Sequence, residues 1–204
     1  MNLESVKSLL SLDPSAHAQN TALLRQLIMP LDAAKQEMNY QFKRALPGLE
    51  SLGLEYGGFS LQPDYQRGHV WTIDQQTAYL ENVLRGVIDT AGLLLKFNCP
   101  NWENHKYEGA LPRGFECLDG LQRLTAVIKF CEGEVRPFGL SVEDLAYSSF
   151  SVTNLHFRVA FYDFQTRADV LRHYLAFNGG GVVHSKDELE RVKGLLLEAI
   201  ERGE

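Results

Sequence analysis

Hydrophobic residues along the chain recur at two spacings, one typical of helices and one typical of strands. In the first 50 residues, apolar side chains repeat every three or four positions. Prolines at Pro14, Pro30 and Pro47 interrupt these runs, which predicts three short helices, the third from about residue 32 to 45. We therefore expect residues 1–50 to form a helical extension and residues 51–204 to form the main domain.

The main domain is predicted to mix strands and helices. Strands are expected at residues 54–61, with a glycine bulge, and at 92–97, 115–118 and 153–162, the last with one buried face. Helices are expected at about residues 72–85, 121–130 and 165–177, with a terminal helix from Ser185. Thr72 with Gln75, and Ser185 with Glu188, have the spacing of capping boxes that begin helices. This order of elements indicates an α+β or α/β fold.

Composition and charge narrow the possible functions. The chain has 204 residues and is 45% hydrophobic, enough for one domain with a core of its own. Twenty basic and 26 acidic residues give a net charge of -6, so a protein that coats DNA over its whole surface is excluded. A local basic groove remains compatible with this charge.

The cysteines and the hydropathy pattern indicate the compartment. Three cysteines without a C-x-x-C pair argue against a disulfide scaffold and a zinc ribbon, and are typical of a reducing compartment. The sequence has no apolar run long enough to span a membrane, and its first residues do not resemble a secretory signal. We expect a soluble, cytoplasmic protein.

The first candidate site segment is P-D-Y-Q-R-G-H-V-W, residues 63–71. Gln66 and Arg67 lie between a predicted strand and a helix start, where loops often carry functional groups. The Arg67 guanidinium could bind a phosphate or a carboxylate. The structural alternative is that Tyr65, Val70 and Trp71 are packing anchors and that Arg67 pairs with a surface acid.

The second segment is D-G-L-Q-R-L-T, residues 119–125, where a predicted strand turns into a helix. The free backbone N–H groups of a helix start bind anions, and Arg123 adds a positive charge. Gly120 allows close approach of a ligand, and Asp119 could hold a divalent cation. The alternative is that Asp119 is only the helix cap and that Arg123 pairs with Glu116 or Glu81. The standard phosphate-loop and dinucleotide motifs are absent from the sequence.

Together the two segments resemble the N-terminal domain of GmrSD-type restriction endonucleases, over roughly residues 52–191. The first family motif reads approximately P-x-[YF]-Q-R-x-x-V-W-x-x-x-Q and the second D-G-Q-Q-R-L-T. An asparagine followed by glycines, at Asn178, and the later Glu188-Leu189 also match. The resemblance implies a compact α+β fold of the ParB/sulfiredoxin-like superfamily whose motifs line a nucleotide pocket.

The resemblance also implies a function and a set of site residues. It implies binding and hydrolysis of an NTP with Mg²⁺, in defence against phage DNA, inside a bacterial cell or a phage-infected host. Expected partners are the nucleotide and DNA, contacted directly or through another protein, and a homo-oligomer is possible. The implied catalytic residues are Asp119, also the metal ligand, Arg67 and Gln66. The implied nucleotide-binding residues are Gly120, Gln122, Arg123, Thr125 and Asn178.

Two departures from the family pattern keep other functions open. Leu121 replaces the first glutamine of D-G-Q-Q-R, and a chain that ends at Glu204 leaves no room for the HNH-type nuclease domain of full-length members. Both favour a non-catalytic nucleotide- or DNA-binding module that gates a partner. A third hypothesis is a DNA nuclease or DNA-base phosphotransferase that uses the same groove. If these residues are the whole protein, DNA cleavage must come from a partner or from the ParB-like site, or not occur.

Overall fold

The computed structural model describes residues 2–66, 68, 70–89, 91–178 and 186–204. The chain forms two compact units, Met1–Ala33 and Ala34–Glu204. The first contains α1 (Leu3–Leu9), a 3-10 turn (Pro14–Ala16) and α2 (His17–Ile28). The Asn2 side chain accepts a hydrogen bond from the Ser5 N–H at 2.9 Å and thereby caps α1. The first two predicted helices are therefore confirmed.

The second unit is built on one mixed sheet. Its strands are β1 (Gln36–Gln41), β2 (Phe59–Ser60), β3 (Leu94–Asn98), β4 (Phe115–Asp119) and β5 (His156–Tyr162), in the order β1-β5-β3-β4-β2. The pairs β1–β5 and β3–β4 are antiparallel, whereas β5–β3 and β4–β2 are parallel. Its helices are α3 (Ala45–Tyr56), α4 (Ile73–Leu84), α5 (Leu121–Cys131), α6 (Arg167–Asn178) and α7 (Lys186–Arg202). The fold is thus α+β, as predicted.

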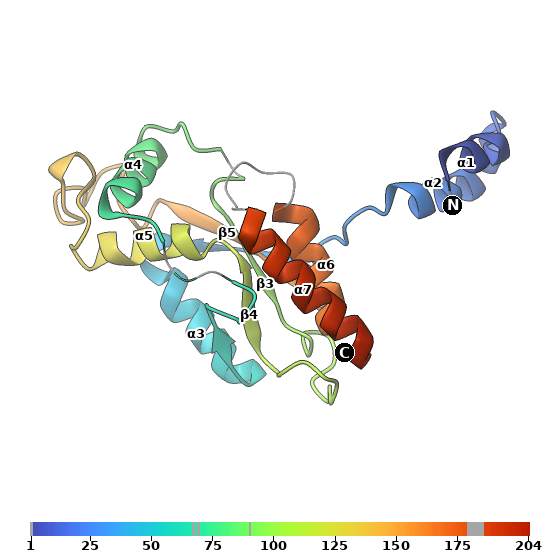
Figure 1. Cartoon of the computed structure of the whole chain (residues 1–204). Coiled ribbons are helices and arrows are strands. Elements are labelled where there is room, and N and C mark those ends of the chain that lie inside the picture. The colour runs from blue at the N-terminus through green and yellow to red at the C-terminus, as the bar shows by residue number, and fades with distance from the viewer. Residues whose placement is uncertain (1, 67, 69, 90, 179–185) are drawn as a thin grey trace. The chain divides into compact units, whose positions relative to one another are not determined.

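Helices cover both faces of the sheet (Figure 1). One core cluster joins α3, α4 and α5 to Leu95, Phe97 and Phe161 of the strands. A second cluster joins α6 and α7 to Leu118, Ala160 and neighbouring strand residues. β5 is therefore buried on both faces, whereas the alternating pattern of residues 153–162 predicted one buried face. The reason is that Ala160 and Tyr162, on the face expected to be exposed, lie under the second helical layer.

The helix predicted over residues 32–45 is wrong, because residues 36–41 form β1. Met38 and Tyr40 alternate with polar residues and pack on the first core cluster. Apolar residues at every second position are typical of a strand, and the prediction of a helix did not take this alternation into account. Segment 34–50 therefore belongs to the sheet unit.

The strand predicted over residues 54–61 is largely wrong as well. α3 continues to Tyr56, and only Phe59 and Ser60 pair with β4. Pro47 does not end a helix but lies in the first turn of α3, where its missing N–H costs no hydrogen bond. Gly57, at φ 106°, caps the C-terminus of α3, so the predicted glycine bulge is a helix end.

The elements around the two motifs agree with prediction. Thr72 and Gln75 form the reciprocal capping box that begins α4. β3, β4, α5 and α6 lie within two residues of their predicted bounds. The cap predicted at Ser185 lies outside the described residues. Among the described helices, none combines the length and the apolar character that a membrane span requires.

Candidate functional site

The first motif lies along the main chain of β4. Tyr65 is fully buried, and its hydroxyl donates to the carbonyl of Cys117 at 3.4 Å. The Gln66 amide nitrogen donates to the same carbonyl at 3.0 Å. Arg191 of α7 donates to the carbonyls of Asp64 at 2.9 Å and Tyr65 at 2.8 Å. Tyr65 is therefore a packing anchor, and Gln66 is held beside the strand that ends at Asp119.

Gln122 joins the first motif to the second. Its side-chain oxygen accepts from the backbone N–H groups of Val70 at 3.0 Å and Trp71 at 3.1 Å. Its amide nitrogen donates to the Gly68 carbonyl at 3.1 Å. The amide thus holds the loop before α4 against the start of α5. In this geometry Gln122 positions the loop, and the nucleotide-binding role that the resemblance implies for it stays a prediction.

The centre of the site is an ion pair within the second motif. The Arg123 Nη2 atom lies 2.6 Å from Asp119 Oδ2, and both side chains are about one-fifth exposed, at 21%. The alternatives considered for Asp119 and Arg123 are both wrong. Gly120 occupies the cap position without a side-chain cap, and Arg123 pairs with neither Glu116 nor Glu81.

Arg123 is also fixed to the sheet. Its Nη2 atom donates to the Leu94 carbonyl of β3 at 2.8 Å. Its Nε atom is buried and, within the described residues, has no hydrogen-bond partner. A guanidinium has five N–H donors, so this anchored side chain retains donors for a ligand.

Gly120 makes the turn from β4 into α5 possible. Its φ of 106° lies in the left-handed region, which residues with a side chain rarely adopt. A Cβ atom at this position would lie 2.4 Å from Cδ2 of Leu95. Only glycine fits the turn at which α5 begins. Because glycine has no side chain to cap the helix, no side chain occupies the first N–H groups of α5 as a cap. Such a helix start favours an anion.

The other predicted residues lie in different environments. The Thr125 hydroxyl donates to the Leu121 carbonyl within α5 at 2.8 Å. Asn178 is buried at the end of α6, where its amide donates to the Tyr174 carbonyl at 2.9 Å. Arg67 lies outside the described residues, as do the glycines that follow Asn178. Leu121, the departure from the family motif, is buried in the first core cluster and so contributes to packing.

The sequence interpretation missed Lys96, which lies next to this site. Lys96 is opposite Asp119 in the β3–β4 ladder, and only 6% of it is exposed. Its Nζ atom lies 3.1 Å from the centroid of the Phe177 ring in α6. The available signal was a single lysine inside the apolar run of residues 92–97, because a lysine on a buried strand is rare.

Glu116 forms a second polar cluster at the opposite end of β4. Its carboxylate accepts from the Asn98 amide at 3.5 Å. Burial raises the pKa of Glu116 to about 7, although Asn98, Arg167 and Tyr65 act in the opposite direction. A cleft of about 310 Å³ opens beside it, lined partly by Asp64 and Arg167.

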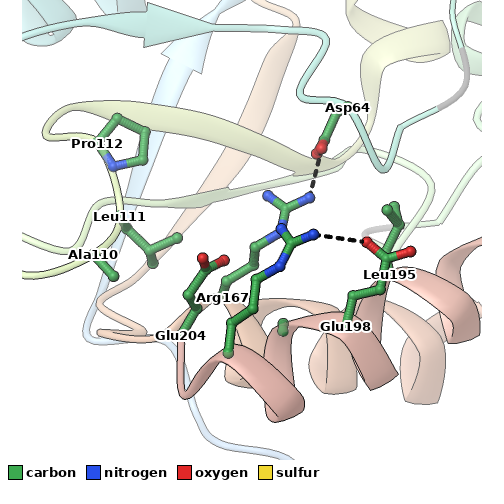
Figure 2. Close-up of a pocket in the computed structure, with 10 residues that line it drawn as sticks. Asp64, Ala110, Leu111, Pro112, Arg167, Leu195, Glu198 and Glu204 are labelled. Carbon is green, nitrogen blue, oxygen red and sulfur yellow. Dashed lines mark hydrogen bonds and ion pairs between the residues drawn. The ribbon is translucent and has the colours of Figure 1, made fainter.

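The neighbouring cleft of about 360 Å³ is shown in Figure 2. Arg167 Nη2 lies 2.5 Å from Asp64 Oδ2, and Arg202 Nη2 lies 3.5 Å from Glu198 Oε2. Both cations on its walls, Arg167 and Arg202, are therefore already paired with carboxylates. The Arg167–Asp64 ion pair fixes the first motif to α6.

Glu116→Gln is expected to stabilise the protein at pH 8 by up to about 3 kcal/mol, and to change stability little at pH 4.5. A carboxyl group whose pKa is raised to about 7 in the fold, from an ordinary value of 4.5, stabilises the fold below pH 4.5. That contribution is lost as the pH rises through 7, whereas glutamine stays neutral. Urea unfolding of both proteins at several pH values measures the difference. For the exposed control Glu190→Gln, the difference in unfolding free energy from the wild type should be the same at pH 4.5 and pH 8. The same pH-independent difference in Glu116→Gln would contradict the prediction.

The site offers a divalent cation one carboxylate. Within the described residues, no three or more His, Cys, Asp or Glu side chains cluster as a metal site. Asp119 nevertheless fits the mode in which Mg²⁺ is held by one or two carboxylates, waters and the phosphates of a nucleotide. A metal at this place would arrive with the ligand.

The family model described as "GmrSD restriction endonuclease, N-terminal domain" matches residues 50–193. No curated protein and no solved structure matches the chain. The matched range includes both motifs, the ion pair and Lys96.

Proposed function

Since this chain belongs to the GmrSD restriction endonuclease N-terminal domain family, we propose that its site at the end of β4 binds and hydrolyses a nucleoside triphosphate with Mg²⁺. The family places the chain in the context of restriction and defence against phage. DNA processing in that context would be the step to which the nucleotide reaction is coupled. Because the net charge is -6, we propose that DNA is contacted through a protein partner or a local groove.

The observation that carries the proposal is the arrangement of Asp119, Gly120 and Arg123. The start of α5 has no side-chain cap, which leaves backbone N–H groups for a phosphate oxygen. Arg123 is tied to the Leu94 carbonyl and to Asp119 through Nη2, and its side chain remains 21% exposed. A cation that is already positioned loses little conformational entropy on binding, and so favours phosphate binding.

The roles of the remaining residues follow from their positions. Asp119 would hold the cation or orient a water for attack on the terminal phosphorus. Mg²⁺, when bound, would supply charge neutralisation of the phosphates. Gln66 contacts β4, and Gln122 holds Gly68 and Val70 against the start of α5. Arg67, as assigned from its motif, would stabilise the charge that develops in the transition state.

A second candidate function is a binding module without turnover. The Asp119 carboxylate is engaged by Arg123 at 2.6 Å, so it must be shared or released before it can hold a cation. If this ion pair stays closed with nucleotide bound, occupancy of the site would gate a partner without hydrolysis.

Arg123→Ala is expected to weaken nucleotide binding by about tenfold or more, because charge-assisted hydrogen bonds to phosphate are lost. The experiment measures phosphate release and calorimetric binding with ATP, GTP, CTP and UTP in Mg²⁺, with and without DNA. Arg172→Ala is the matched control, since Arg172 forms an exposed ion pair with Asp169 at 2.8 Å on α6.

The outcomes separate the two functions. Release that depends on Arg123 supports an NTPase, and binding that depends on Arg123 without release supports the gating module. Wild-type binding that Arg123→Ala leaves unchanged would refute the assignment of this site, and no binding of any nucleotide by the wild type would refute the proposed function.

A further inference from the structure

Lys96 is a buried cation in the middle of the sheet. Its neighbours Leu95 and Phe97 are fully buried, and its register partner on β5 is Ala160. An ammonium group in such surroundings loses hydration, a cost that proteins normally offset with an ion pair or hydrogen bonds. An apolar side chain at this position would avoid that cost.

The fold compensates only in part for the lost hydration of the Lys96 ammonium. The Lys96 ammonium lies against the face of the Phe177 ring, and such a contact stabilises a cation. The described residues offer it no hydrogen bond and no ion pair within 4.0 Å. An ammonium has three N–H donors. Lys96 itself lies opposite Asp119, the last residue of β4.

Among the described residues, the two charged groups that act on the Lys96 ammonium, Asp119 and Arg123, belong to the proposed nucleotide site. Asp119 is its partner in the β3–β4 ladder, and Arg123 donates to the carbonyl of Leu94, two residues before Lys96. The electrostatic effects of Asp119 and Arg123 both reach the ammonium. Two cations and one carboxylate leave an excess of positive charge at a helix start, which is matched by an anion.

We infer that Lys96 is a second phosphate-binding residue of this site, whose ammonium and the Arg123 guanidinium bind oxygens of the same phosphate chain. This inference rests on the proposed function. It adds to the site a residue outside both motifs, contributed by the strand beside β4. The ligand class is a polyphosphate anion, either free or as part of a nucleotide.

The inference implies a pH dependence of binding. Burial lowers the pKa of Lys96 to about 8, Arg123 acts in the same direction, and Asp119 opposes them. The groups that contact Lys96 from α6 and β5, Phe177 and Ala160, carry no charge. Because the protonated amine binds the anion, affinity is highest below pH 8 and falls as the pH rises above it. A bound phosphate in turn favours the protonated form.

The test compares the wild type with Lys96→Met, which keeps the length of the side chain and removes its charge. Binding of inorganic pyrophosphate and of the four nucleotides with Mg²⁺ is measured by calorimetry between pH 6.5 and 9.5. We expect Lys96→Met to weaken binding about tenfold at pH 7 and to flatten the pH profile above pH 8. Lys35→Met is the control, because Lys35 is an exposed lysine of the same unit, paired with Glu103 and Asp163.

Folding and the proposed function are tested separately. Thermal unfolding should show Lys96→Met to be at least as stable as the wild type, and Lys96→Gln serves as a second variant if methionine disturbs packing. Unchanged affinity and pH profile in both variants, with binding still dependent on Arg123, would overturn the role of Lys96 and leave the proposed function standing. No binding of pyrophosphate or nucleotide by the wild type would refute both.

Discussion

Asp119→Asn is expected to lower nucleotide turnover by about 100-fold or more while leaving affinity equal to or higher than that of the wild type. The variant removes the negative charge that holds Arg123 at 2.6 Å and that lies opposite Lys96. Both cations would then be freer to bind phosphate, so binding without Mg²⁺ should be tighter. Turnover should fall because the carboxylate that holds a cation or orients water is lost.

Steady-state phosphate release and calorimetry with and without Mg²⁺ measure these two effects. The control is Glu190→Gln, which removes an exposed ion pair with Lys193 of the same length, 2.6 Å, on α7. Full turnover in Asp119→Asn would refute the catalytic role of Asp119. Weaker binding without Mg²⁺ would show that the carboxylate preorganises Arg123 more than it repels the phosphate.

Gly114→Ala is expected to destabilise the fold by about 4 kcal/mol, a large effect for one methyl group. Gly114 precedes β4 and has φ 102°. A Cβ atom there would lie 2.5 Å from the oxygen and 2.6 Å from the nitrogen of Gly58. The obstacle is backbone, and it is fixed by the hydrogen bond from the Phe115 N–H to the Gly58 carbonyl at 2.9 Å. Relief of the clash would therefore separate β2 from β4.

Chemical denaturation of Gly114→Ala beside Gly133→Ala tests this prediction. Gly133 also has a positive φ, 81°, but its Cβ would have open space, so Gly133→Ala carries only the conformational cost of about 1 kcal/mol. If the two variants lost the same free energy of unfolding, the predicted clash between residue 114 and the Gly58 backbone would contribute nothing to stability. Because β4 leads directly to Asp119, the loss in Gly114→Ala should also impair binding at the site.

The elements that carry the motifs could be predicted because their signals are local. The capping box of Thr72 and Gln75 fixes the start of α4 through two hydrogen bonds between residues three apart. The turn from β4 into α5 depends on a glycine at one position. In both places, neighbouring residues are enough to select the backbone conformation.

Most of the errors arose where contacts between distant residues decide the structure, and the error at Pro47 arose from a local feature. Residues 36–41 contain both helix-forming residues and a short period of two, and pairing with β5 selects the strand. Pro47 was expected to end a helix, whereas the first turn of α3 tolerates it. At β5, the second helical layer covers a face that the alternating pattern alone assigned to solvent.

The sequence by itself determined the family of the chain, its α+β class and the two motifs that carry the candidate site residues. Each of these depends on local patterns of residues. Only the tertiary structure decided how those residues are used. Gln122 holds a loop about 50 residues earlier in the chain, Arg123 pairs with Asp119, and Lys96 lies opposite Asp119 on the neighbouring strand. The physical reason is that charge pairing and burial depend on distance in space, which strand order and helix packing set and which sequence spacing does not contain.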